Sequence, residues 1–125
     1  MKLRFDKDGS VAFFCPACKT AHSINVGVTQ RPRWSYNGNA EAPTFMPSVK
    51  VRGIRQDLTE EQEAQYVKDY PGAGTRDAAL SDRRYGFCCH LWVRDGLADF
   101  CSDSTHALAG KLGVPLPDFP HQDSP

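Results

Sequence analysis

Apolar and polar residues alternate through much of the first half of the chain. They alternate in 2–14 on either side of the polar turn 7–9, which predicts a β-hairpin. Residues 21–26 continue the alternation and predict a third strand. Two further alternating runs, 33–36 and 49–54, predict short strands later in the chain.

Three prolines interrupt the segment between these last two strands. Pro32, Pro43 and Pro47 each lack a backbone N–H, and each would remove one hydrogen bond from a sheet ladder. We therefore expect an extended, ordered loop over much of 31–48 rather than a central strand.

Helical signals are concentrated after residue 57. Thr59 and Gln62 match a capping box, and good helix formers follow to Tyr70, so a helix is predicted from 59 to 70. Its apolar stripe is thin, which places it on the surface. Glycines and charges in 71–85 predict a mobile loop.

A second hairpin is centred on Arg94-Asp95-Gly96, a turn signal between two apolar runs. Beyond it, Asp103 can cap a short helix at 104–109. Cysteines lie at both hairpins, in Cys15-Pro16-Ala17-Cys18 and in the arms of the second, and such spacing is typical of zinc sites. The chain is thus expected to be one zinc-binding domain, 1–125, with a surface helix-loop insertion at about 57–85. The fold class is α+β and β-rich, with zinc-ribbon-like antiparallel hairpins, one peripheral helix and one short C-terminal helix.

Charge and composition exclude several classes of protein. Lys and Arg total 15 and Asp and Glu total 15, giving zero formal net charge, so no global field favours nucleic acid. No apolar run reaches the roughly 18 residues of a membrane span, and the start of the chain carries charges where a signal peptide is apolar. We expect a cytoplasmic protein, in the host cytoplasm if it is phage-encoded.

The cysteines predict a metal site. Cys15-Pro16-Ala17-Cys18 lies between two predicted strands, which is typical of a zinc knuckle in a reducing compartment. The remaining ligands depend on the register of the second hairpin. A three-residue turn sets Cys89 opposite Cys101, and a two-residue turn sets His90 opposite Cys101. The preferred zinc ligands are Cys15, Cys18, Cys89 and Cys101, with His90 as the alternate ligand.

Four other side chains form a candidate catalytic group. They could bind a second metal, transfer protons or hold an anionic ligand: His22, His90, Asp103 and His106. The alternative is structural, with Asp103 as a helix cap and the histidines as hydrogen-bonded neighbours of the zinc ligands.

Several motifs also suggest a family. They are Phe14-Cys15-Pro16-Ala17-Cys18 with His22, Trp34-Ser35-Tyr36-Asn37-Gly38-Asn39, Pro43-Thr44-Phe45-Met46-Pro47-Ser48, Cys89-His90-Leu91-Trp92-Val93-Arg94-Asp95-Gly96 and Phe100-Cys101-Ser102-Asp103-Ser104-Thr105-His106-Ala107-Leu108-Ala109-Gly110. This pattern resembles an uncharacterised family of small proteins from tailed phages, prophages and some bacterial operons, some members of which are labelled ammonia monooxygenase. Relatives occur beside ubiquitin-like conjugation genes, which implies a ligase-like adaptor or a zinc peptidase. The resemblance implies one shared site for these residues: Cys15, Cys18, His22, Cys89, His90, Cys101, Asp103 and His106.

Two functions therefore compete. The first is a zinc-binding phage or prophage accessory protein that acts as an interaction module for an unidentified protein partner. The second is a zinc-dependent hydrolase, possibly a peptidase linked to ubiquitin-like conjugation. A structural zinc is closed by four protein ligands, whereas a catalytic zinc keeps a position for water.

Overall fold

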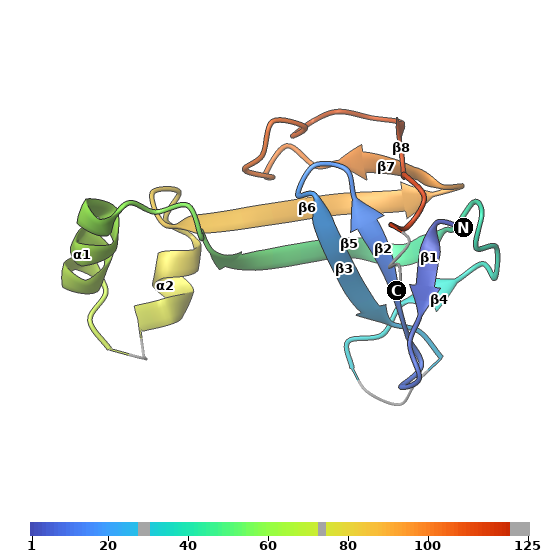
Figure 1. The fold of residues 1–125 in the computed structure, drawn as a ribbon, viewed down its shortest axis with the longest axis horizontal. Helices are drawn as coiled ribbons and strands as arrows, with labels where there is room; N and C mark the ends of the chain where they lie inside the picture. Colours follow the sequence, from blue (N-terminus) through green and yellow to red (C-terminus); the bar gives the residue numbers. More distant parts are fainter. Residues whose placement is uncertain (28–30, 73–74, 121–125) are drawn as a thin grey trace, which may run out of the picture.

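The computed structural model describes residues 1–27, 31–72 and 75–120, which form two antiparallel sheets and two helices (Figure 1). The first sheet has the order β1-β2-β3, with bounds β1 Leu3–Phe5, β2 Ser10–Cys15 and β3 Thr20–Asn25. The second has the order β4-β5-β6-β7-β8, with bounds β4 Ser35–Tyr36, β5 Phe45–Ile54, β6 Gly86–Arg94, β7 Leu97–Phe100 and β8 Val114–Pro115. The expected β-rich α+β class is confirmed.

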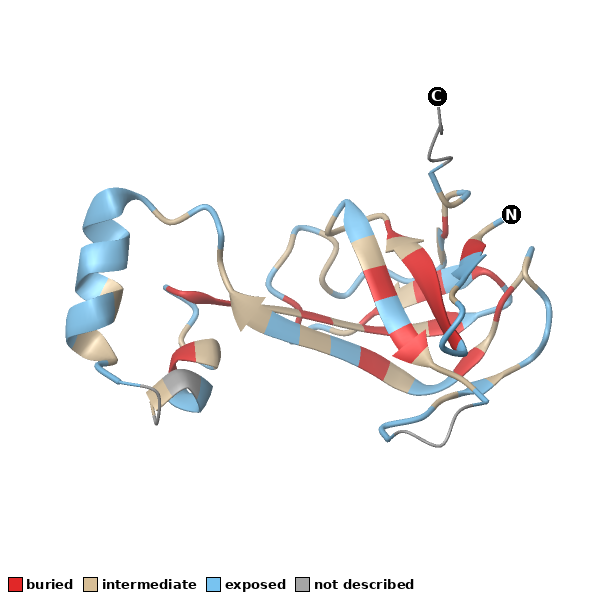
Figure 2. Ribbon diagram, turned by 60° about the horizontal axis from the view of Figure 1, so that its bottom comes forward, coloured by how far each residue is buried: buried red, intermediate tan, exposed pale blue. Residues whose placement is uncertain are grey.

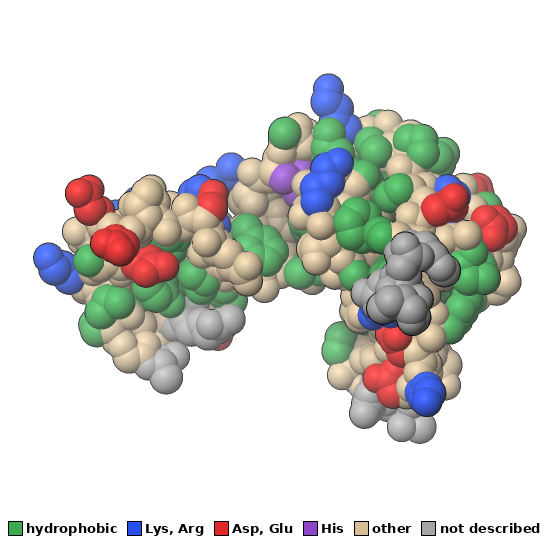
Figure 3. All heavy atoms as spheres, in the orientation of Figure 1, with side chains coloured by type: hydrophobic (Ala, Val, Ile, Leu, Met, Phe, Trp, Pro, Cys, Tyr) green, Lys and Arg blue, Asp and Glu red, His purple; other side chains and the backbone are tan. Residues whose placement is uncertain are grey.

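The helices α1 (Glu60–Asp69) and α2 (Arg76–Leu80) connect β5 to β6 at one end of their long hairpin (Figure 1). The capping box of α1 is formed, because Thr59 Oγ1 accepts from the Gln62 N–H at 3.1 Å and Gln62 Oε1 accepts from the Thr59 N–H at 2.8 Å. No described residue of α1 is buried (Figure 2). Acidic side chains gather at this end of the molecule (Figure 3). The predicted surface helix is therefore present, and we call residues 57–85 the helical arm.

The expected loop at 71–85 is wrong in part, because it contains α2. Ala79 is fully buried and Tyr85 is 3 % exposed, so the base of the arm packs against the strands. The Tyr85 hydroxyl donates to Asp69 at 2.6 Å. These contacts hold the base of the arm in place, although nothing in the local sequence signals them.

The strand β5 extends further toward the N-terminus than its alternating pattern indicated. It begins at Phe45 and passes through Pro47, where an extended loop was expected. The pairing of β5 with β6 shifts register between Phe45 and Val49, and such an irregularity accommodates a residue without an N–H. The expectation of a loop up to residue 48 is therefore wrong at its C-terminal end.

The hairpin between β6 and β7 turns on two residues. Arg94 pairs with Leu97 and Leu91 pairs with Phe100, while Asp95 and Gly96 both have positive φ, at 51° and 77°. Two positive φ values are typical of a type I′ turn. Of the two registers that the sequence left open, the structure has the one that sets His90 opposite Cys101.

The expected short helix at 104–109 is absent, and turns take its place. The reason lies in Ser104 and Thr105, whose side chains bond to the backbone of β6. Ser104 Oγ accepts from the His90 N–H at 3.0 Å, and Thr105 Oγ1 accepts from the Cys88 N–H at 3.0 Å. Such side-chain bonds compete with helix formation, and here they fasten the segment along β6.

The core lies between the two sheets. Phe13 of β2 stacks on Phe45 of β5, with ring centroids 6.2 Å apart, and both are fully buried. Leu91 and Val93 face the same core from β6. Within the described ranges, no helix is long and apolar enough to cross a membrane.

Candidate metal site and catalytic triad

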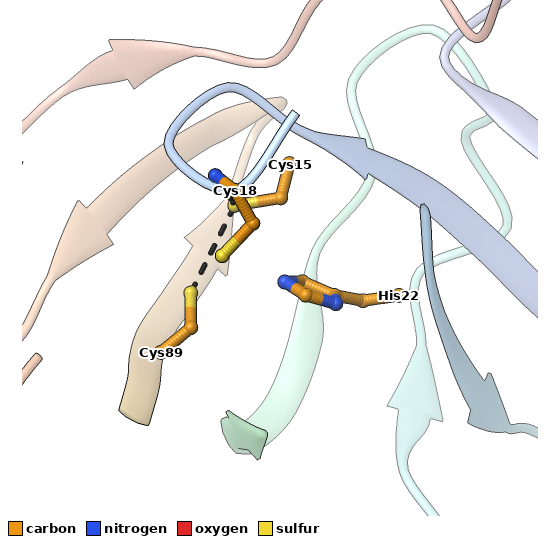
Figure 4. A group of neighbouring side chains, drawn as sticks. All are labelled: Cys15, Cys18, His22 and Cys89. Carbon is orange, nitrogen blue, oxygen red and sulfur yellow. Dashed lines mark hydrogen bonds between the residues drawn. The ribbon is translucent and has the colours of Figure 1, made fainter. Parts of the chain in front are cut away.

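Three thiols and one imidazole meet between the two sheets. β2 ends at Cys15, a tight turn leads to Cys18, and His22 follows on β3, while Cys89 comes from β6 (Figure 4). One donor atom from each of these four residues lies within 4.8 Å of the other three. We call this group the thiol cluster.

The geometry of the thiol cluster fits a tetrahedral metal ion. The sulfurs of Cys15 and Cys89 are 3.8 Å apart, and two thiolates bound to one zinc at about 2.3 Å would be about 3.8 Å apart. His22 Nε2 is buried and has no hydrogen-bond partner among the described residues, which is costly unless the nitrogen binds something. Three sulfurs and one nitrogen are a donor set preferred by zinc. These four residues could therefore hold a metal ion.

The thiols also influence one another's protonation. Hydrogen bonds from the thiols of Cys18 and Cys89 hold the pKa of Cys15 far below its usual range. The same contact with Cys15 raises the pKa of Cys18 to about 11, and hydrogen bonding to Cys15 likewise raises the pKa of Cys89. One thiolate thus forms readily, and a bound metal would displace the other protons.

Cys101 lies outside the thiol cluster. In the observed register its N–H donates to the His90 carbonyl at 2.8 Å, and its thiol lies with His90 and Asp103, one donor atom from each within 4.8 Å of the others. Zinc ligation by Cys101, with His90 as the alternate, stays a prediction. His22 occupies the fourth position around the thiol cluster.

The other face of β6 carries a hydrogen-bonded chain of three side chains. His90 Nε2 lies 2.9 Å from Ser48 Oγ. The opposite ring nitrogen, Nδ1, lies 3.0 and 3.1 Å from the two carboxylate oxygens of Asp103. A hydroxyl, an imidazole and a carboxylate in this order form the arrangement of a Ser-His-Asp triad.

The fold positions each member of the triad. Ser48 lies in the irregular part of β5, between Phe45 and Val49, and Trp34 Nε1 donates to its carbonyl at 3.1 Å. The backbone N–H of His90 is held by Ser104, and Asp103 is the preceding residue of the same turn. All three side chains are thus set by neighbouring backbone contacts.

Electrostatics keep the carboxylate of the triad ionised. Partial burial raises the pKa of Asp103, but the hydrogen bond from His90 and the nearby Lys50 outweigh it, and the pKa falls below its ordinary value. Lys50 Nζ is 3.4 Å from Asp103 Oδ2. Asp103 is therefore charged at neutral pH and can hold the Nδ1 proton of His90.

Comparison with known families agrees with this geometry. Residues 2–101 match the family model described as bacterial ubiquitination-like system serine protease (BubE). The chain belongs to this family. A search of curated proteins and of solved structures finds no match. The matched range includes Ser48 and His90 and ends two residues before Asp103.

Membership in the BubE family agrees with the predicted link to ubiquitin-like systems and with the peptidase alternative. The predicted phage origin stays a prediction. The resemblance implied a single site for eight Cys, His and Asp residues, whereas the structure places seven of them in two groups on opposite faces of β6.

His106 belongs to neither group. Its ring contacts Phe100 edge to face at 4.8 Å between ring centroids, and its Nδ1 accepts from the Leu108 N–H at 3.2 Å. Burial lowers the pKa of His106, which favours the neutral imidazole. Of the four predicted catalytic residues, the structure brings together only His90 and Asp103, while His22 joins the thiols.

Sequence reasoning missed Ser48. A serine has no spacing that marks it as a nucleophile, and Ser48 lies 42 residues from His90. The available signal was the candidate pair His90 and Asp103, which are two members of a triad with no assigned nucleophile. Searching for a serine in the opposite strand would have found it.

Proposed function

We propose that this protein is a serine peptidase of a ubiquitin-like conjugation system, with Ser48 as nucleophile, His90 as base and Asp103 as the residue that orients His90. The observation that carries the proposal is the chain of contacts Ser48 Oγ to His90 Nε2 and His90 Nδ1 to Asp103, at 2.9 and 3.0 Å. Both lie within hydrogen-bond range without any movement of the backbone.

The reaction follows from these contacts. His90 Nε2 takes the hydroxyl proton of Ser48 as Oγ forms a bond to the substrate carbonyl carbon. His90 then gives that proton to the departing amine as the C–N bond breaks, leaving an acyl ester on Ser48. Water, deprotonated by the same nitrogen, releases the acid and restores Ser48. Asp103 stabilises the imidazolium that forms in each half of the reaction.

A zinc ion at the thiol cluster would have a structural role in this proposal. Cys15, Cys18, His22 and Cys89 supply four protein donors, which is the closed set of a structural site. The metal would cross-link the β2–β3 hairpin to β6. Four protein donors leave no coordination position for a water molecule, and this supports a serine mechanism over the zinc-dependent hydrolase. The predicted role as an interaction module remains a proposal separate from the peptidase. The predicted protein partner would, under the peptidase proposal, be the protein substrate.

Covalent labelling tests the proposal. The metal-loaded protein is treated with a fluorophosphonate, and the labelled peptide is identified by mass spectrometry. We expect one adduct, on Ser48, and its loss in both Ser48→Ala and His90→Ala. Ser23→Ala removes an exposed hydroxyl from β3 and is the matched control, in which labelling should be unchanged.

Two results would contradict the proposal. One is a folded, metal-loaded protein that takes no label. The other is an adduct that persists undiminished in Ser48→Ala. A zinc hydrolase would give the first of these results and would lose activity on chelation before the fold is lost.

A further inference from the structure

A pocket of about 210 Å³ lies beside the triad, on the same face of β5 and β6. In the regular part of β5, Lys50 and Arg52 are two residues apart, so their side chains share one side of the strand. Lys50 Nζ lies 3.4 Å from Asp103 Oδ2, which places this side next to the triad. Lys50 pairs with His90 and Arg52 pairs with Cys88. The floor and walls of the pocket are completed by Gly86, Thr105, Asp103 and the α2 end of the helical arm.

The pocket is strongly basic. Three cationic side chains line it, namely Lys50, Arg52 and Arg83, against a single carboxylate, Asp103. That carboxylate is already bonded to His90 and Lys50. Within the described ranges, Arg52 and Arg83 form no ion pair. The lining therefore carries two unneutralised positive charges.

Two neighbouring arginines differ from Arg52 and Arg83 in this respect. Arg55 pairs with Asp57 at 2.8 Å, and Arg84 pairs with Asp82 at 2.8 Å. Both lie close in sequence to the pocket residues, yet each is neutralised by a carboxylate two residues away. Among the described side chains of 52–55 and 82–84, the arginines without an ion pair thus lie at the pocket, and two such charges suit a small anionic group better than a long polyanion.

We propose that this pocket is a substrate subsite that binds one acidic side chain, Asp or Glu, of the polypeptide cleaved at Ser48. The inference rests on the proposed peptidase function and adds a substrate class to it. Arg52 is the principal specificity-determining residue, and Arg83 supports it from the base of the helical arm.

The distance between pocket and nucleophile sets the position of the acidic residue. Residues two and four positions along a strand lie about 7 and 13 Å away, at roughly 3.3 Å per residue. A substrate extended along β5 advances by the same rise. Its acidic residue should therefore lie two to four positions from the cleaved bond, on one side of it.

Peptide profiling tests the subsite. The metal-loaded protein is incubated with a peptide library, and cleaved bonds are identified by mass spectrometry. Peptides that differ only by Glu or Gln at each position are then compared by kcat/KM. We expect about a tenfold preference for Glu at one position, corresponding to about 1.4 kcal/mol, and its reduction in 1 M salt.

Charge reversal identifies the residue responsible. In Arg52→Glu the preference for Glu over Gln should disappear or change to a preference for Lys. Lys7→Glu makes the same charge change at an exposed turn of the first hairpin and should keep the tenfold preference. If Arg52→Glu unfolds, Arg83→Ser is the second variant, and it should reduce the preference for Glu. Its melting temperature is measured to confirm that it is folded.

The outcomes separate the two proposals. Ser48-dependent cleavage at equal rates for Glu and Gln would overturn the subsite alone. With no cleavage of any peptide, protection of Ser48 from fluorophosphonate by the Glu peptide, and not by the Gln peptide, would still support the subsite. If the peptides are neither cleaved nor protective, the subsite proposal is overturned. Labelling of Ser48 by the fluorophosphonate would then decide whether the peptidase proposal stands. Binding of a short DNA duplex that is lost in Arg52→Glu would reassign the pocket to nucleic acid.

Discussion

Adjacent residues of β6, Cys89 and His90, have entirely different surroundings. Cys89 is fully buried among thiols and an imidazole. His90 retains 23 % side-chain exposure and lies between a hydroxyl and a carboxylate. Because neighbours on a strand point to opposite faces, a single strand can present a buried thiol cluster on one face and a more exposed hydroxyl–imidazole–carboxylate chain on the other.

The comparison also suggests how the open face depends on the buried one. A metal bound to Cys89 would attach β6 to the β2–β3 hairpin. The backbone of β6 then fixes the next residue, His90, whose N–H is already held by Ser104. The buried face would thus keep the backbone rigid under the catalytic face, as preorganised sites require.

Removing the metal should have the largest effect. We expect about one zinc per chain, contributing on the order of 10 kcal/mol to the free energy of unfolding. Chelation, or Cys89→Ser, should therefore unfold the protein and abolish labelling of Ser48 as a consequence. Elemental analysis measures the zinc content, and circular dichroism measures the loss of folded structure. A folded, metal-free protein with a reactive Ser48 would show that the buried face does not support the open one.

Asp103→Asn should act on the open face alone. An amide cannot hold the Nδ1 proton of His90 in the same way, so kcat should fall by ~10⁴-fold, as in other triads. Zinc content and melting temperature should remain close to those of the unchanged protein. Asp57→Asn, the same change at an exposed carboxylate on the arm, is the control for kcat. A loss of metal in Asp103→Asn would mean that the buried face also depends on the open one.

Gly86→Ala should disturb the joint between the arm and β6. A Cβ atom at this position would lie 2.2 Å from the Leu80 carbonyl oxygen, part of the backbone of α2, so no side-chain rotation relieves the clash. We expect a loss of about 1–3 kcal/mol in the free energy of unfolding, as for other overpacked sites. Urea denaturation measures this loss. The metal content should be unchanged, and an undiminished stability would place α2 away from β6.

Cys101→Ser should have the smallest effect. If His22 is the fourth metal ligand, replacing Cys101 removes none, and the stability change should stay within about 0.5 kcal/mol. His22→Ala should instead weaken metal binding steeply, because it leaves three protein ligands. The metal affinity of the two variants, measured by competition with a chromogenic chelator, decides whether His22 or Cys101 is the fourth ligand. The reverse order would restore Cys101 as the ligand that the sequence favoured.

Several elements could be predicted from the sequence because their causes are local. The capping box of Thr59 and Gln62, the Asp95-Gly96 turn and the first hairpin each depend on residues within a few positions of one another. The closeness of Cys15 and Cys18 is also local, because only two residues separate them. Proline was a weaker guide, since the irregular register of β5 accommodates Pro47.

The identity of the two sites depended on which strands pair. The sequence alone singled out Cys15, Cys18, Cys89, His90 and Asp103 as candidate ligands or catalytic groups, because these residue types occur there in closely spaced motifs. Only the tertiary structure decided that His22 joins the thiols and that Ser48 meets His90. The physical reason is register, because a two-residue turn and the alternation of β6 set which side chains share a face, and Ser48 reaches His90 only across 42 residues of chain.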